Sequence, residues 1–400
     1  MLRLVIRKEI LSNLSSPTFI ITFVLCSGLI LLSIYTGLRN YSDQVTEYRL
    51  TQSINRELLG EQTNYRDVGR NGVQLSKPPK VLSILVSGLE NSLGRHATVS
   101  LYSPHPKMTS SKIEGNPIFA LFGSLDLMFL TKTVLALLAI LFTYNAISGD
   151  KESGTLRLTL SYPVPRDTVI LGKILGGFIC LMIPIVLPIL FAAALLTAFP
   201  DVQMAGQDWV RVGLILASFV LYLTLFFTLG MFVSSRTTRS SISFLVLLFV
   251  WVVCTLVIPK GSVIMAGQFI PVPSIHEHRL RLNQMMRSLH RDLRPEMMET
   301  YKKFPYPKRK KIPSGAPKAE RDQIMAEWKK QRDEVRKKQQ EAIQELFEKM
   351  RVEREAGEAR MEQEYANKQR ALAALAVSLS RISPAAAMTY ATMTIAGTGI

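Results

Sequence analysis

The residues best suited to chemistry lie in one short polar segment between two long apolar runs. Glu152, placed near a helix start, would stabilise the positive end of that helix, and Gly154 permits a turn or a close approach. Arg157 and Arg166 offer fork-shaped donors to an acidic partner surface. The alternative interpretation is an ordinary capped, basic loop at a membrane face. The segment itself reads Ser148-Gly149-Asp150-Lys151-Glu152-Ser153-Gly154-Thr155-Leu156-Arg157.

No pattern typical of an enzyme accompanies this segment. The chain has no Gly-x-x-x-x-Gly-Lys-Ser/Thr phosphate loop, because Gly172-Lys173 lacks the first glycine and the following hydroxyl. His276-Glu277-His278 with His290 offers too few convergent ligands for a metal site, so no metal is expected. No Gly-x-Ser-x-Gly nucleophile elbow occurs either. Energy for any work must therefore come from another subunit or from an ion gradient. A gradient is disfavoured, because the apolar runs contain no Asp or Glu apart from Asp126 at an edge.

The apolar residues form runs of membrane-spanning length. The chain has 400 residues, of which 48% are hydrophobic. About 20 apolar residues are needed to cross the roughly 30 Å hydrocarbon core, so we predict an all-α polytopic membrane protein with five spans. The first run is too long for the apolar region of a signal peptide. The predicted spans are 18–38, 127–147, 169–199, 212–234 and 241–266.

Charge in the short loops predicts the orientation of these spans. Arg3, Arg7 and Lys8 precede the first run and favour a cytoplasmic N-terminus. The loops 148–168 and 235–240 are basic, whereas 200–210 has no Lys or Arg, and this agrees with an alternation that places 39–117 and 267–400 outside. Five spans leave residue 400 outside. Either that is the native end, or a sixth helix follows residue 400.

Two charged residues near the second span have two interpretations. Asp126 would be costly at a helix centre, so the span should begin just after it. Lys132 would then reach back to the headgroups with its long side chain. We expect both to be interfacial anchors; the alternative is a functional ionic site.

Residues 39–117 predict a small α/β subdomain outside the membrane. Residues 40–60 look helical, 81–86 read as a strand or a helix start, and 97–101 alternate as a strand does. Ser103-Pro104-His105-Pro106 should break that strand.

Residues 267–400 predict a long helical domain outside the membrane. Helical periodicity over 274–300 is followed by a basic, proline-rich break at 304–313. Residues 318–380 contain no proline and predict one long helix, or a hairpin broken near Gly357. Its interrupted apolar stripe fits either a coiled-coil-like seam for an envelope partner or packing within the domain.

The formal net charge is +17, with much of the excess after residue 267. Anionic lipid headgroups explain this excess more economically than nucleic acid does.

The polar segment and its flanks resemble the first cytoplasmic loop of ABC-2 type transporter permeases. The matching pattern is an acidic residue, x, Gly-Thr, a Ser/Pro-rich turn with an Arg, and a Gly-Lys in the next helix. Lys8-Glu9-Ile10 fits the family's N-terminal amphipathic helix, here 1–17. The large exterior insertions resemble the NosY-like and gliding-motility-type branch, as does Arg381-Ile382-Ser383-Pro384. The family has six helices per permease, whereas this sequence shows five.

The resemblance implies an ABC-2 (type V exporter-like) transmembrane domain that works with a separate cytoplasmic ABC ATPase. The ATPase would bind the ATP and magnesium, and this chain would carry no cofactor. A second permease copy or homologue would complete a dimer in a bacterial inner membrane. The expected function is export or extraction of an unidentified substrate. One alternative is a subunit that transmits a mechanical signal to a periplasmic or envelope partner. Another is a membrane-anchored scaffold without an ATPase. The resemblance assigns coupling to Glu152, Gly154, Thr155, Arg157 and Arg166, and close helix packing at the dimer interface would use Gly172, Gly176 and Gly177.

Overall fold

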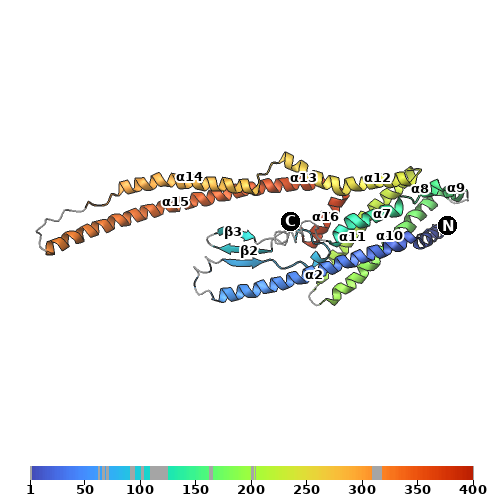
Figure 1. The fold of residues 1–400 in the computed structure, drawn as a ribbon, viewed down its shortest axis with the longest axis horizontal. Helices are drawn as coiled ribbons and strands as arrows, with labels where there is room; N and C mark the ends of the chain where they lie inside the picture. The colour runs from blue at the N-terminus through green and yellow to red at the C-terminus, as the bar shows by residue number, and fades with distance from the viewer. Residues whose placement is uncertain are drawn as a thin grey trace. The chain divides into compact units, whose positions relative to one another are not determined.

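The computed structural model divides the chain into two compact units. Unit 1 comprises Met1–Gly261 with Leu379–Ile400, and unit 2 comprises Ser262–Ser378. Figure 1 shows the ribbon of the chain, with its helices and strands labelled. The structure describes residues 2–61, 64, 68, 72–90, 95–100, 103–108, 125–161, 165–199, 202, 204–308 and 318–399.

Five helical stretches of the described chain are long and apolar enough to cross a membrane, which confirms the polytopic fold. Two of these stretches each contain one π-helical turn, and each is therefore divided into three consecutive labelled elements. Side chains such as Ile21, Leu221 and Phe249 are exposed on these helices, as expected for surfaces that face lipid. The stretches are α2 (Pro17–Glu61), α6–η2–α7 (Leu127–Leu130, Thr131–Leu135, Ala136–Thr143), α10 (Arg166–Ala198), α11 (Gly206–Arg236) and α12–η3–α13 (Ser240–Val252, Val253–Val257, Ile258–Phe269).

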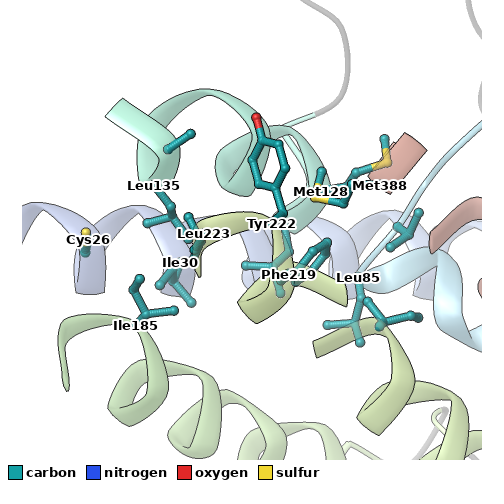
Figure 2. Close-up of a cluster of buried hydrophobic side chains, with 14 of the residues drawn as sticks. Cys26, Ile30, Leu85, Met128, Leu135, Ile185, Phe219, Tyr222, Leu223 and Met388 are labelled. Carbon is teal, nitrogen blue, oxygen red and sulfur yellow. The ribbon is translucent and has the colours of Figure 1, made fainter. Parts of the chain in front are cut away.

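Helix α11 supplies much of the core of unit 1. Figure 2 shows Phe219, Tyr222 and Leu223 of this helix beside Ile30 of α2 and Ile185 of α10. All five side chains are buried. The Tyr222 hydroxyl donates to the Lys132 carbonyl at 3.1 Å. That bond satisfies a carbonyl within the π-helical turn η2, where the regular helical ladder is interrupted.

A small antiparallel sheet lies between the first two spans. Its order is β1 (Val73–Ser76), β2 (His96–Ser100) and β3 (Ser103–Met108). The expected strand at 97–101 therefore exists as β2, which ends at Ser100, before Ser103. The residues Ser103–Pro106, expected to interrupt regular structure, instead begin β3. Proline is tolerated there since β3 is an edge strand of the sheet formed by the described residues. Residues 81–86 contain the short 3₁₀ helix η1 (Val81–Ile84), not a strand.

The first spanning helix continues well beyond the expected end at residue 38. Helix α2 runs without a break to Glu61, so the helix expected at 40–60 is its continuation. The sheet is attached to this continuation, because Asn55 Nδ2 donates to the Gln74 carbonyl at 2.7 Å. His96 Nε2 also lies 3.3 Å from Glu47 Oε1.

Asp126 precedes the second span, as expected, but it is buried rather than placed at an open interface. Its Oδ1 accepts from Phe129 N at 2.8 Å and so caps α6. Its Oδ2 accepts from Ser87 N at 3.0 Å and from Ser87 Oγ at 2.7 Å. Asp126 therefore joins the segment after η1 to the start of the second span.

Unit 2 is built on two long helices, α14 (Ile275–Lys303) and α15 (Lys318–Ser380). Of the two arrangements left open for 318–380, the structure has the single helix. Gly357 lies within it, and a Cβ there would come 2.7 Å from Met285 Sδ of α14. Glycine at this position therefore serves the close approach of two helices rather than a chain break. His278 and Tyr365 stack between the same helices, with ring centroids 4.3 Å apart.

The end of the chain corrects the expected exterior domain 267–400. Residues Leu379–Ile400 belong to unit 1 instead of unit 2. They contain α16 (Pro384–Ala396), which begins at a Ser383 cap. Ala385 and Met388 of α16 are buried in the same core as α11. The physical reason is composition: this short helix is rich in Ala, Met and Thr and carries no charge, so its burial is favourable.

Candidate functional site

The polar segment after the second span folds into two short helices. They are α8 (Ser148–Glu152) and α9 (Thr155–Leu160). Gly154 between them has φ +77°, a left-handed conformation, and a Cβ there would meet nothing within 4 Å. Backbone conformation, rather than space, therefore calls for glycine at this position.

The start of α8 is anchored to the end of α11. Ser234 Oγ accepts from Ile147 N at 3.1 Å and from Ser148 N at 3.0 Å. Ser148 Oγ in turn donates to the Tyr144 carbonyl at 2.7 Å. Ser148 and Ser234 are both fully buried, so this contact fixes the first turn of α8.

Two neighbouring charged residues of α8, Lys151 and Glu152, are bonded to the turn between α11 and α12. Lys151 Nζ donates to the carbonyls of Ser235 and, at 3.1 Å, Thr237. Glu152 Oε2 accepts from Ser240 N at 3.1 Å and Ser240 Oγ at 2.9 Å. Lys151 thus satisfies carbonyls at the end of α11, and Glu152 caps the start of α12.

Asp150 connects α8 to two further helices through one lysine. Lys173 Nζ on α10 lies 2.8 Å from Asp150 Oδ2 and 3.1 Å from Glu9 Oε1. Glu9 belongs to α1 (Leu2–Leu14), the N-terminal helix. The three side chains are only 13–33% exposed, so solvent screens this ionic cluster incompletely. We call Glu9, Asp150 and Lys173 the ionic junction.

The three candidate packing glycines lie against helices of the same chain. A Cβ on Gly172 would come 2.5 Å from Val5 Cγ1, and one on Gly176 would come 2.8 Å from Glu9 Cβ. A Cβ on Gly177 would come 3.2 Å from Cζ of Phe227 on α11. The close contacts are therefore with α1 and α11. This differs from the expected dimer interface, because these faces of α10 are already occupied.

The remaining predicted coupling residues are exposed. Thr155 Oγ1 donates to Asp150 Oδ1 at 3.3 Å across the bend at Gly154. Arg157 on α9 and Arg166 at the start of α10 project to the surface, and the neighbouring Leu158 is 66% exposed. Pro163, in the connection between them, lies outside the described residues.

The structure brings Glu152 and Thr155 together with residues that the sequence did not single out. Asp150 and Lys151 belong to the motif, but their partners Ser234, Ser235 and Ser240 gave no signal in the sequence. Lys173 could have been singled out from the sequence, because it is the charged residue inside the apolar run 169–199. A cation in such a run calls for a nearby carboxylate, and Glu9 could have been considered on that ground.

The arrangement is suited to mechanical coupling. Three successive charged residues of α8 contact α10, the end of α11, and the start of α12. The outward surface of α9 is exposed at Arg157 and Leu158. The histidines near 276–290 belong to unit 2, and His290 Nδ1 is bonded to the Met286 carbonyl of its own helix.

Comparison with known proteins matches the chain to one family and to curated relatives. Residues 3–306 match the family described as "ABC-2 family transporter protein". The chain is 35% identical over 109 residues to "Probable ABC transporter permease protein NosY" of Pseudomonas aeruginosa, an alignment covering 27% of this chain and 39% of the relative. It is 28% identical over 142 residues to the protein of the same name from Stutzerimonas stutzeri, covering 34% and 51%. The alignments thus span about half the length of these relatives or less.

Proposed function

Because this chain belongs to the ABC-2 family of transporter proteins, we propose that it is a permease subunit driven by a separate ABC ATPase. In this proposal, the ATPase lies on the cytoplasmic side, contacts α9 and the start of α10, and hydrolyses ATP. A second permease copy or homologue completes the complex in a bacterial inner membrane. The N-terminus and the α11–α12 turn lie on the same side as α8.

One observation carries the proposal: α8 is bonded directly to α10, α11 and α12, and Lys173 extends the contact to α1, while the adjoining surface of α9 is exposed. Arg157 and Leu158 of that surface are exposed. An acidic or apolar surface on the ATPase would fit them. Movement of α9 would reach α8 across Gly154 and then the spanning helices through the ionic junction and Glu152.

The test separates binding from coupling. Arg157→Glu with Arg166→Glu reverses the outward charge and should abolish association with the ATPase. Asp150→Asn with Glu152→Gln leaves that surface intact; association should persist while stimulated ATP hydrolysis falls, on the order of tenfold for a loss of about 1.4 kcal/mol. The matched control is Arg39→Glu with Arg211→Glu, two exposed arginines outside the polar segment. If the control weakened association as much as the first pair did, the assignment of the contact surface would be wrong.

Membership of the family suggests that a substrate is exported or extracted, but it does not identify that substrate. A second candidate function, mechanical signalling, is favoured by the 63 residues of α15, which form a single helix. Spin labels on α14 and α15 distinguish the two. An ATP-dependent change in their separation without substrate would favour signalling, and a change that requires substrate would favour transport.

A further inference from the structure

Unit 2 has a chemically distinct end, where α14 finishes and α15 begins. Trp328 Nε1 of α15 donates to the Pro307 carbonyl at 3.1 Å, and Gln339 Nε2 donates to the Phe304 carbonyl at 2.6 Å. These bonds hold the chain after α14 along the first turns of α15, and Figure 1 shows the two helices side by side. We call the described residues among 298–308 and 322–338 the hairpin end.

Positive charge is concentrated toward this end. Residues 301–338 contain 14 Lys and Arg against five Asp and Glu, a net charge of +9, whereas the whole chain carries +17. Residues 339–378, the rest of α15 in this unit, contain six Lys and Arg against eight Asp and Glu. The polarity along the helix is therefore a property of its sequence, with cations near the hairpin end and a slight acidic excess beyond it.

The cations of the hairpin end are available to a partner. Lys302 and Lys308 are exposed, as are Lys329, Lys330, Lys337 and Lys338 of α15. Lys329, Lys330 and Lys337 line one shallow surface hollow with Asp333 and Glu334. Among the side chains that the structure describes, no ion pair joins these lysines to a carboxylate. Arg351 and Lys368, farther along α15, are paired with Glu348 and Glu364 within the same helix.

Large apolar and aromatic side chains are exposed among these lysines. They are Met298 and Tyr301 of α14, Tyr306, and Met325 of α15. Lysines attract anionic headgroups over a diffuse surface, while aromatic and methionine side chains insert at the boundary between headgroups and acyl chains. Ten of the 14 cations are lysines rather than the fork-shaped arginines that suit planar, bidentate recognition. The combination favours a lipid surface over an acidic protein.

We propose that the hairpin end binds the surface of an anionic bilayer. Helix α15 has 63 residues, which extend about 95 Å at 1.5 Å per residue. A whole bilayer with its headgroups is only about 40–45 Å thick. The helix is therefore longer than a bilayer is thick, and its basic residues are concentrated toward one end. The inference is independent of the ATPase contact proposed above.

The experiment uses the full chain in nanodiscs of zwitterionic lipid. These are mixed with vesicles of phosphatidylcholine alone or with about 30% phosphatidylglycerol, and bound nanodiscs are separated by flotation. The unmodified chain should float with the anionic vesicles only, and about 0.5 M salt should release it, since the Debye length then falls to roughly 4–5 Å. Each lysine near such a surface contributes about 1 kcal/mol.

The matched variants carry four substitutions each on α15. Lys329→Gln, Lys330→Gln, Lys337→Gln and Lys338→Gln should weaken vesicle binding on the order of 1000-fold. The control, Lys349→Gln, Arg351→Gln, Arg360→Gln and Arg370→Gln, removes the same formal charge from exposed positions farther along the helix and should bind normally. Equal binding by both variants would overturn the proposal. So would binding to soluble dextran sulfate without binding to vesicles, which would indicate a polyanion instead of a bilayer.

Discussion

Replacing Lys173 by methionine tests the ionic junction directly. Methionine keeps the length of the side chain and removes the ammonium group that lies 2.8 Å from Asp150 and 3.1 Å from Glu9. The two carboxylates would then share a partly buried site without a cation. Exposed ion pairs contribute about 0.2–1 kcal/mol, whereas removing one partner of a fully buried pair costs about 3–5 kcal/mol. The partial exposure of all three side chains places the expected loss at about 2 kcal/mol.

Thermal unfolding of the chain in nanodiscs measures this loss. About 2 kcal/mol corresponds to a decrease in Tm of roughly 4 °C for a unit of this size. Adding Asp150→Asn and Glu9→Gln to Lys173→Met removes the two unpaired charges, so most of the decrease should be recovered. Lys260→Met, at an exposed lysine of α13, is the control and should change the free energy of unfolding by less than about 0.5 kcal/mol.

Two results would refute the reasoning. One is a Tm for Lys173→Met equal to that of the unmodified chain. The other is a further decrease when the two carboxylates are neutralised, since that would mean that their unfavourable proximity was not the cause. With the ATPase present, Lys173→Met should also lower stimulated hydrolysis without lowering association, because the outward surface of α9 is unchanged.

Three other substitutions address α10, the α8–α9 bend and the start of the second span. Gly172→Val should cost about 1–3 kcal/mol by overpacking against Val5, and a Tm equal to that of the unmodified chain would contradict this contact. Gly154→Ala should cost about 1 kcal/mol through its positive φ; an unchanged free energy of unfolding would show that the bend relaxes. Burial raises the pKa of Asp126 despite bonds from Phe129 and Ser87, so the folded chain holds this proton more tightly than the unfolded chain. Stability should therefore fall as pH rises from the ordinary aspartate pKa through the raised one, and a pH profile left unaltered by Asp126→Asn would exclude this carboxyl as the cause.

Much of the architecture was predictable because hydrocarbon imposes simple requirements. Apolar runs of sufficient length gave all five spans, and the cost of a buried charge placed the start of the second span after Asp126. The continuation of α2 to Glu61 was less evident. Its polar half resembles any exposed helix, and nothing local in the sequence marks a boundary at residue 38.

The partners within the candidate site were harder to predict than its motif. Gly154 and Glu152 could be identified from their types and spacing, since a left-handed bend favours glycine and a helix start favours a carboxylate. The helix that Glu152 caps is α12, which follows 88 residues later in the chain at Ser240. Such a contact depends on how the spans pack together, and one sequence without related sequences carries little information about it. For the same reason, the glycines of α10 suggested a close helix contact but not which helix makes it.

The geometry of α8 indicates where movement is transmitted and where it is absorbed. Successive residues of an α-helix are rotated by about 100°, so Asp150, Lys151 and Glu152 point in three directions and contact different helices. A displacement of α8 must therefore shift several helices or break several bonds. Adjustment is easiest just after it, at Gly154, where the backbone is left-handed and a Cβ would meet no atom of the described residues within 4 Å. We therefore expect α9 to change its angle first as a partner approaches, and α8 to move only when the force on α9 exceeds what this bend accommodates.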